Sequence, residues 1–255
     1  MRNYTVWNPS GNVTVFGTLC PGESAAAVGA ALLKAEPAAE QAGFLRYDMP
    51  GCEVRLDMAG GEFCGNATLS AAARYARDSK LPVGCSETIR VSCSGVDKVL
   101  TVALERLSED EFRGTVEMPE PLTLRQPDQT ICPYPAVLLP GIGHVIVEGP
   151  ERLFDPQAVI RSRCDSLQQE ALGILFYDAA DCSMVPYVYV KAVDTLFREG
   201  ACASGTAALG YYLACKNGSK FQGEIRQPRG TLSVEATAAG RILLTGTTTL
   251  IKIQT

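Results

Sequence analysis

The pattern of apolar and polar positions predicts many short β-strands interrupted by a few helices. Alternation of the two kinds of residue is typical of strands with one buried face, and it recurs through the first half of the chain. We expect strands at Tyr4–Trp7, Val13–Leu19, Phe44–Asp48, Glu53–Met58, Thr88–Ser94, Lys98–Glu105 and Phe112–Met118. The first two flank the turn sequence NPSG and should form a hairpin. Helices are expected at Ala27–Ala35, preceded by Ser24, and at Ala67–Arg77.

A stretch rich in proline, from Met118 to Pro140, is the best candidate for a boundary between two halves. We therefore expect one domain over residues 1–119 and a second over residues 120–255. The pattern restarts beyond the boundary. Strands are expected at His144–Val147, Gly173–Tyr177, Val185–Lys191, Gly223–Arg226, Thr231–Ala236 and Arg241–Ile253, and helices around Pro156–Arg163 and from Cys202 to Lys216.

The two halves contain an internal repeat. The segment FCGNATLSAAARYA opens its helix at Cys64, and ACASGTAALGYYLA opens its helix at Cys202, so the offset is 202 − 64 = 138. At this offset Thr68 aligns with Thr206, and each cysteine follows an acidic residue and precedes small ones. The repeat predicts two related halves, each with a thiol at the start of a helix.

Composition narrows the class of protein. Hydrophobic residues make up 46% and charged residues 20% of the 255 residues, as in ordinary globular proteins, and the net charge is −5. Without a run of Lys and Arg, the chain lacks the electrostatic signature of a nucleic-acid binder. The longest apolar stretch, Ala25–Leu33, is too short to span a membrane, and no signal peptide is evident. We expect a cytoplasmic protein that contacts neither nucleic acid nor membrane.

Ten cysteines and a single histidine, His144, limit the available chemistry. We expect free thiols, because the cytosol is reducing. No pair forms C-x-x-C, and one histidine cannot complete the usual Cys/His zinc patterns. The sequence also lacks phosphate-binding and dinucleotide-binding glycine motifs. We therefore expect neither a metal nor a cofactor, and we expect His144 to form hydrogen bonds within a glycine-rich turn rather than to act in catalysis.

Cys64 and Cys202 are the strongest candidates for catalysis. The first N–H groups of a helix lack internal partners, so they bind anions and favour thiolate over thiol. Two facing thiols suit racemisation at an amino-acid α-carbon, which needs a base on one face of the carbon and an acid on the other. The remaining cysteines are assigned to packing; they are Cys20, Cys52, Cys85, Cys93, Cys132, Cys164, Cys182 and Cys215.

Several motifs resemble the diaminopimelate epimerase superfamily of pyridoxal-independent racemases and epimerases. These motifs are SGN at 10–12, CGNAT at 64–68 and CASGT at 202–206. The longer blocks NPSGN, EFCGNAT and QPRG look most similar to the histidine racemases of opine-metallophore biosynthesis. The resemblance implies an α/β (α+β) fold of two pseudo-symmetric halves, each a twisted, mostly antiparallel sheet around a central helix. It also implies interconversion of L- and D-histidine, which would supply D-histidine for a metal-scavenging opine.

The same resemblance implies the roles of individual residues. Cys64 and Cys202 would be the two acid/base thiols of a cofactor-independent mechanism. Asn12 and Glu199 would face the substrate and position its α-ammonium group. The backbone N–H groups that would hold the α-carboxylate are those of Gly65, Asn66, Ala203 and Ser204.

The chain departs from the diaminopimelate epimerases where they hold the distal end of their substrate. The loop Phe197–Ala201 is shorter here, and Ile142 stands where those enzymes have an asparagine. A distal zwitterion would lose its partners, which disfavours diaminopimelate, although Arg198 leaves that substrate open.

Alternatives therefore remain. They are a diaminopimelate epimerase, a racemase of another amino acid, a thiol redox sensor with a reversible Cys64–Cys202 disulfide, and an amino-acid-binding protein. The expected partner is a small amino-acid substrate, and a homodimer is an open alternative to a monomer.

Overall fold

The computed structural model describes residues 3–47 and 49–254, and it contains every strand predicted for the first half. These strands are β1 (Tyr4–Pro9), β2 (Thr14–Gly17), β3 (Gln41–Tyr47), β4 (Val54–Met58), β5 (Ser86–Cys93), β6 (Leu100–Arg106) and β7 (Glu111–Glu117). The predicted hairpin is confirmed, because β1 pairs antiparallel with β2. Asp48, the last residue of the predicted strand Phe44–Asp48, lies outside the described residues.

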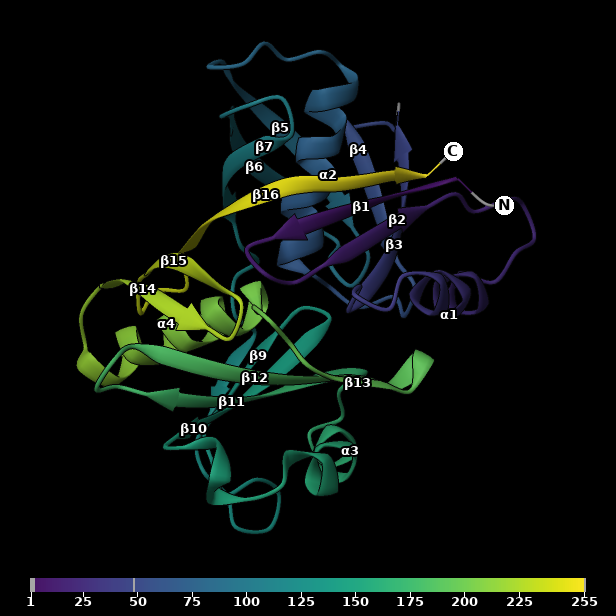
Figure 1. Ribbon diagram of the computed structural model, residues 1–255. Coiled ribbons are helices and arrows are strands. Elements are labelled where there is room, and N and C mark those ends of the chain that lie inside the picture. The colour runs from purple at the N-terminus through teal and green to yellow at the C-terminus, as the bar shows by residue number, and fades with distance from the viewer. Residues whose placement is uncertain (1–2, 48, 255) are drawn as a thin grey trace.

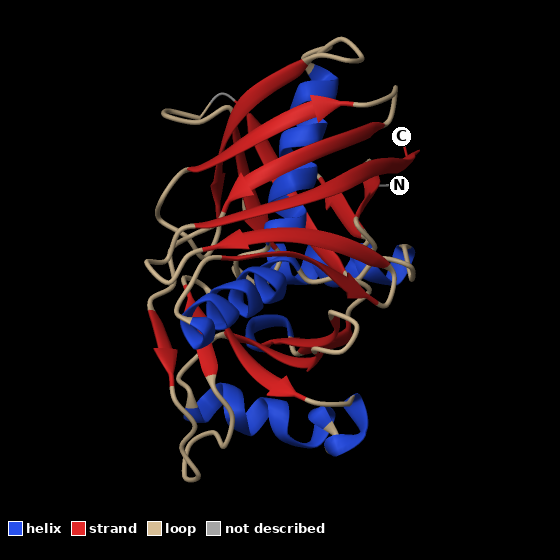
Figure 2. Cartoon of the chain, turned by 90° about the vertical axis from the view of Figure 1, so that its left-hand side faces the viewer, coloured by secondary structure: helices blue, strands red, loops and turns tan. Residues whose placement is uncertain are grey.

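The strands of the first half curve around α2 (Gly65–Asp78), as Figures 1 and 2 show. The sheet closes because β16 (Ile242–Gln254) pairs antiparallel with β7 on one side and with β1 on the other. The helix fits inside this ring because its inward positions carry small side chains, which are buried at Ala67, Ala71, Ala72, Ala73 and Ala76. Leucine or phenylalanine at these positions would force the strands apart.

The second half repeats this arrangement around α4 (Ala203–Asn217). Its strands are β8 (Thr123–Arg125), β9 (Ala136–Leu139), β10 (Ile142–Glu148), β11 (Ala171–Asp178), β12 (Ser183–Val190), β13 (Thr195–Arg198), β14 (Phe221–Gln227) and β15 (Gly230–Ala236). The helix packs against β9, β10, β14, β15 and β16. The fold expected from the resemblance is therefore confirmed: each half is a mostly antiparallel sheet around a central helix.

The order of elements confirms the internal repeat. In the first half, α1 (Ala25–Ala35) connects the parallel strands β2 and β3, and in the second, α3 (Pro156–Ser166) connects the parallel strands β10 and β11. In the same way α2 connects the parallel pair β4 and β5, and α4 connects the parallel pair β12 and β14. The central helices therefore start at equivalent points of the two halves.

The halves differ in two places. Strands β8 and β9 lie inside the proline-rich stretch Met118–Pro140, where the sequence pattern predicted a boundary and no strand. The connection from β12 to α4, residues 191–202, is twice as long as the one from β4 to α2, residues 59–64, and it carries the short helix η2 (Lys191–Val193) and β13. This longer connection breaks the symmetry beside the start of α4.

The last strand joins the two halves, since β16 pairs with β15 as well as with β7 and β1. The division between residues 119 and 120 stays a prediction.

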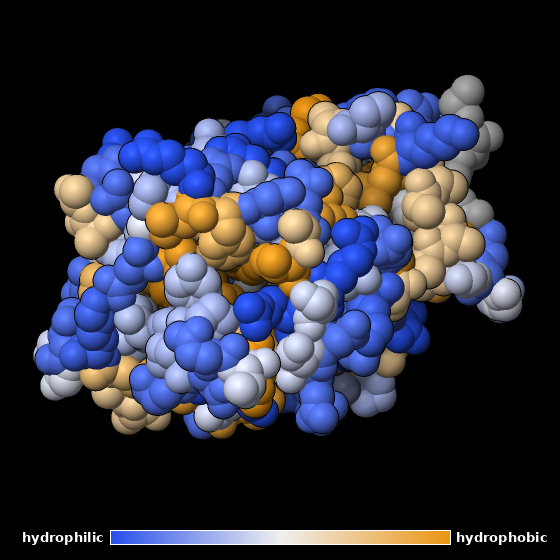
Figure 3. Space-filling view, turned by 90° about the horizontal axis from the view of Figure 1, so that it is seen from below, coloured by the Kyte–Doolittle hydropathy of each residue, from blue (hydrophilic) through white to orange (hydrophobic). Residues whose placement is uncertain are grey.

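Apolar side chains gather in a band across the face seen in Figure 3, and polar side chains border it. Within the described ranges, no helix is long and apolar enough to cross a membrane.

Candidate active site

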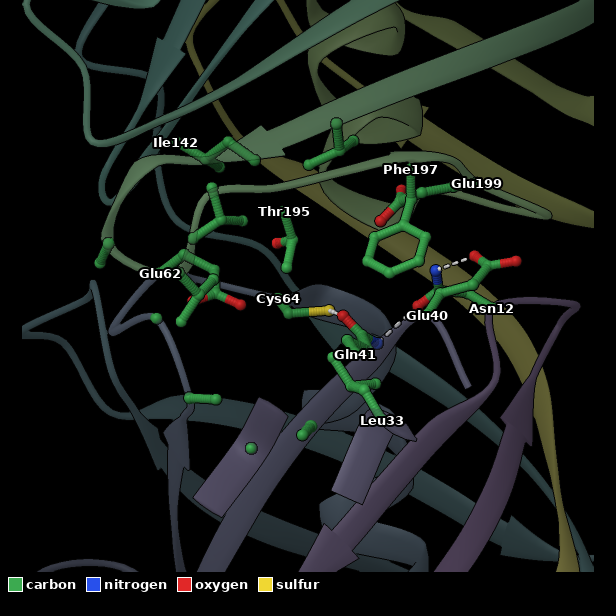
Figure 4. A pocket seen from close by; sticks show the side chains of 18 of the residues that line it. Asn12, Leu33, Glu40, Gln41, Glu62, Cys64, Ile142, Thr195, Phe197 and Glu199 are labelled. Atoms are coloured by element: carbon green, nitrogen blue, oxygen red, sulfur yellow. Dashed lines mark hydrogen bonds between the residues drawn. The ribbon is translucent and has the colours of Figure 1, made fainter. Parts of the chain in front are cut away.

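The starts of α2 and α4 meet where the two halves join, and a cleft of about 410 Å³ opens beside them. Cys64 and Cys202 both line this cleft, one from each half. The contact is close, because a Cβ atom at Gly65 would lie 2.9 Å from the Cβ of Ala203. Figure 4 shows the Cys64 side chain in the middle of the cleft. The structure therefore brings together the two residues that the repeat singles out.

The two cysteines occupy matching positions, because each is the N-cap residue of its helix. The hydroxyl of Thr68 donates to the Cys64 carbonyl (2.8 Å), and the hydroxyl of Thr206 donates to the Cys202 carbonyl (2.7 Å). The surroundings of the sulfurs differ. Cys64 Sγ accepts a hydrogen bond from Ala67 N (3.3 Å), whereas Cys202 Sγ lies 3.6 Å from Ser204 Oγ.

The surroundings of both thiols favour the protonated form. Burial raises the pKa of Cys64 and of Cys202 well above the usual value, and the nearby Glu199 carboxylate raises both further. The Ala67 N–H lowers the pKa of Cys64, but by less than burial raises it. The expectation that the helix N-termini alone would favour thiolates was therefore wrong, because desolvation outweighs the helix dipole here.

Gln41, at the start of β3, holds the Cys64 thiol in place and was not predicted. The Cys64 S–H donates to Gln41 Oε1 (2.9 Å), and Gln41 Nε2 donates to Asn12 Oδ1 (2.5 Å) and to Thr14 Oγ1 (2.7 Å). The partners of the sulfur, Gln41 and Ala67, and those of Nε2, Asn12 and Thr14, all come from the first half. The amide oxygen of Gln41 accepts a hydrogen bond and cannot take the proton, so this network orients the thiol without deprotonating it.

Two carboxyl groups, Glu199 and Glu40, lie together on one side of the cleft (Figure 4). Burial raises the pKa of Glu199 to about 8, and the charge of Glu40 adds to the shift, whereas hydrogen bonds from Cys202 and Asn12 oppose it. Burial also raises the pKa of Glu40. Glu40 accepts hydrogen bonds from Asn12 Nδ2 (2.8 Å), Gly200 N (3.1 Å) and Arg229 Nη1 (3.0 Å). Glu199 and Asn12 both line the cleft, and their role toward a substrate stays a prediction; Glu40 lines the cleft as well and was not predicted.

Asn66 connects the two helix starts. Its Oδ1 accepts a hydrogen bond from Ala203 N (2.6 Å), and its Nδ2 donates to the carbonyl oxygens of Pro9 (3.0 Å) and Ala201 (3.4 Å). The N–H of Ala203, one of the four predicted to hold a substrate carboxylate, therefore has a partner within the protein. The carboxylate role of Gly65, Asn66, Ala203 and Ser204 stays a prediction.

His144 lies fully buried in β10 rather than in a turn, and its Nε2 is 2.9 Å from Ser204 Oγ. Burial lowers the pKa of His144 to about 3, so the ring is neutral. Gly173 provides the space for the ring, since a Cβ there would lie 2.2 Å from Nδ1. His144 thus bonds to the start of α4 rather than within a glycine-rich turn as expected, and it does not line the cleft.

The motifs NPSGN and QPRG meet behind the site. A Cβ atom at Gly230 would lie 1.7 Å from the carbonyl oxygen of Ser10, and one at Gly200 would lie 2.1 Å from that of Gly11. Gln227 Oε1 accepts a hydrogen bond from Cys202 N (2.7 Å), and its Nε2 donates to Thr206 Oγ1 (2.9 Å). These motifs therefore fix the start of α4 against the first half.

Apart from its carboxyl groups, the cleft lining is mainly apolar. It includes Leu33 of α1, Val190 of β12, Val193 of η2, Phe197 of β13 and Ile142, together with the carboxyl of Glu62. None of the residues that α1, η2 and β13 contribute to the cleft lining was predicted from the sequence. Arg198 pairs with Glu151 (2.7 Å) and does not line the cleft, so it provides no distal charge there. Within the described residues, no group of three or more His, Cys, Asp or Glu could hold a metal ion.

Residues 2–251 match the sequence profile of the family described as "Histidine racemase CntK N-terminal domain". A histidine racemase of Fusobacterium nucleatum is 36% identical over 200 residues, which cover 76% of this chain and 72% of the relative. A histidine racemase of Staphylococcus aureus is 24% identical over 250 residues, covering 91% and 87%. The structure of a predicted epimerase from Pseudomonas aeruginosa superposes with a TM-score of 0.70 at 13% identity, covering 100% of this chain and 98% of the other, and shares the fold.

Proposed function

The chain belongs to the CntK histidine racemase family and is an amino-acid racemase, and we propose that it interconverts L- and D-histidine with Cys64 and Cys202 and without a cofactor. One observation carries the proposal above all others. The two thiols sit at matching N-cap positions of the two central helices and line one cleft. A substrate α-carbon bound between them would have one sulfur on each face, which is the geometry that a two-base racemase requires.

The helix starts provide a binding site for the substrate carboxylate. The first N–H groups of α2 and α4 point into the region where the helices meet, and such groups attract anions. Removal of the α-proton places additional negative charge on the carboxylate, and the same N–H groups stabilise that charge. We assign this role to Gly65, Asn66 and Ser204, with Ala203 contributing if its bond to Asn66 exchanges.

The substrate ammonium group has an acidic place to bind. Glu199, Glu40 and the Asn12 amide form one hydrogen-bonded cluster beside the thiols. A bound ammonium would offset the repulsion between the two carboxyl groups. The charge of Glu199 raises the pKa of both thiols, and the positive charge of the ammonium would lower it again. Substrate binding itself would thus make a thiolate easier to form.

The two thiols differ in what can take their proton. The Cys202 thiol donates to the Glu199 carboxylate, whereas the Cys64 thiol donates to the amide oxygen of Gln41. In the forward step, the bound ammonium would lower the pKa of Glu199 and leave it ionised, Glu199 would accept the Cys202 proton, and the Cys202 thiolate would then take the α-proton from one face of the carbon. Cys64 would deliver its own proton to the opposite face, leaving Cys64 as the thiolate. The reverse reaction would start from the Cys64 thiolate as the base, with the Cys202 thiol protonating the opposite face and then regaining the proton held by Glu199.

Incubation with L-histidine in D₂O, without added pyridoxal phosphate, tests the proposal. We expect deuterium at the α-carbon and formation of the D-enantiomer. The double variant Cys64→Ala, Cys202→Ala should do neither, and the control Cys85→Ala, at an exposed position, should behave as the wild type. Exchange that persists in the double variant would contradict the two-thiol mechanism. A panel of other L-amino acids and diaminopimelate tests the choice of substrate. A compound in the panel that reacts faster than histidine would contradict the assignment of histidine as the substrate.

A further inference from the structure

The departure from two-fold symmetry lies in the mainly apolar part of the cleft lining. A symmetrical pair of thiols suits racemisation, because the hydrogen of the α-carbon leaves from one face of the carbon and returns to the other. The side chain of the substrate stays in one place, so its binding site should not be duplicated. The long connection 191–202 of the second half supplies Val193, Thr195 and Phe197 to the cleft, and residues 59–64 of the first half are too few to form a counterpart. The unsymmetrical part of the cleft is therefore the natural place for a substrate side chain.

The shape of this region suits a small ring. Its floor and walls are made of small and aliphatic side chains, at Gly29, Leu33, Ala59 and Val190. A Cβ atom at Gly60 would lie 2.5 Å from Val190 and 2.6 Å from the carboxylate oxygen Oε2 of Glu62. The missing side chain at Gly60 thus leaves room for a carboxylate between aliphatic groups.

One oxygen of that carboxylate has no partner among the described residues, whereas the backbone of residues 60 and 62 provides hydrogen bonds to the carboxyl group. Glu62 Oε2 is buried and has no hydrogen-bond partner there. Burial raises the pKa of Glu62, and its backbone neighbours oppose the shift only in part. A buried carboxylate oxygen without a partner costs free energy, so its presence calls for a donor that arrives from outside the protein. In Figure 4 Glu62 lies on the opposite side of Cys64 from Glu199 and Glu40.

We propose that Glu62 is the residue that selects the substrate side chain, by accepting a hydrogen bond from a ring N–H on the side of Cys64 opposite Glu199. This inference rests on the proposed function, since it assigns Glu199, Glu40 and Asn12 to the amino-acid head and Glu62 to the imidazole. It restricts the substrate to amino acids whose side chain is short and carries an N–H donor. Side chains that end in a carboxylate are excluded, because their charge would face that of Glu62.

A substrate pair tests the inference. L-Histidine and β-(2-thienyl)-L-alanine both carry a five-membered aromatic ring, and only histidine has a ring N–H. We expect the wild type to exchange the α-proton of histidine faster than that of the thienyl compound. In Glu62→Met, kcat/KM for histidine should fall about 10- to 100-fold, mainly through KM, because one hydrogen bond to a charged group is lost. The thienyl compound should react as fast as before or faster. Glu62→Gln keeps an acceptor oxygen and should recover part of the loss.

Thermal unfolding separates this role from a structural one. If Glu62 serves the substrate, Glu62→Met removes a desolvated carboxylate and should raise Tm, whereas a structural carboxylate would lower Tm when removed. The matched control is Glu87→Gln on β5, which is exposed and should change neither KM nor Tm. An unchanged preference for histidine in Glu62→Met would overturn the inference and leave the proposed function intact. A wild type that prefers the thienyl compound, or that exchanges neither, would overturn both.

Discussion

The side-chain oxygen of Asn66 accepts a hydrogen bond from the backbone N–H of Ala203, so the start of one central helix is bonded directly to the start of the other. The two residues belong to different halves of the fold and are 137 positions apart. Asn66 is 2% exposed, so its polar atoms have no water to replace the partners that they have in the protein.

Asn66→Ala is therefore expected to destabilise the protein. The substitution leaves the N–H of Ala203 buried without its partner, at a cost of about 2 kcal/mol in the free energy of unfolding, whereas the carbonyl oxygen of Pro9 keeps the N–H of Asn12. Urea unfolding measures this loss. The control Asn217→Ala, at the exposed end of α4, should be within about 0.5 kcal/mol of the wild type. A stability equal to that of the wild type in Asn66→Ala would mean that the bond between the helix starts contributes nothing net.

Gln41→Leu should reduce racemisation by about 10-fold, because the Cys64 thiol loses the acceptor that orients it. The two enantiomers have equal free energy in solution, so kcat/KM must fall equally for L- and D-histidine. Polarimetry or chiral chromatography from both enantiomers measures the two values. Gln222→Leu, at an exposed position of β14, is the control. Full activity in Gln41→Leu would show that the thiol needs no acceptor on this side.

The buried carboxyl of Glu199 makes stability depend on pH. Its folded-state pKa of about 8 lies above the ordinary value of 4.5, so the folded protein binds more protons than the unfolded chain between these values. Stability should fall as the pH rises from about 5 to 8. Glu40 acts in the same direction, because burial also raises its pKa.

Glu199→Gln should remove part of this dependence. The difference in unfolding free energy between the variant and the wild type should grow as the pH rises, in the variant's favour, and urea unfolding at several pH values measures it. Glu62, Cys202 and Asn12 also face this carboxyl. Because burial raises the pKa values of Glu40 and Glu62 as well, the variant should keep the part of the pH dependence that these two carboxyl groups cause. A difference that is constant with pH would mean that Glu199 has an ordinary pKa in the folded protein.

Gly230→Ala should destabilise the protein by about 3 kcal/mol, because its methyl group would overlap the Ser10 carbonyl oxygen, a backbone atom that cannot turn aside. Gly223→Ala on the neighbouring strand is the control, since its methyl group would meet only the ring of Phe221 at 3.2 Å. Thermal unfolding of the two variants compares them. Equal values of Tm would show that the NPSGN and QPRG turns can separate without cost.

Local signals in the sequence predicted the helices and the two thiols. The small residues after Cys64 and Cys202 allow each helix to lie inside a sheet, and both segments carry the same pattern. The pairing of β1 with β2 followed in the same way from a turn between two alternating runs. Each of these features depends on residues close together in the chain.

What the sequence did not reveal depends on contacts between distant segments. Gln41 and Glu40 reach the site because β3 pairs in parallel with β2, and no local pattern marks them. The four residues of β13 are too short a run to distinguish from a loop. The high pKa of the two thiols arises from burial by both halves, whereas the helix start, which is local, predicted the opposite shift.

The position of β16 has a consequence for synthesis of the protein. The ring around α2 stays open between β7 and β1 until β16, residues 242–254, has been made. A nascent chain that ends before this strand exposes two unpaired strand edges, which favour aggregation, and long-range pairing of this kind is slow. The first thiol is translated early, yet the sheet around its helix is completed only after β16 has been made, so a chain that ends before this strand has no closed ring around α2.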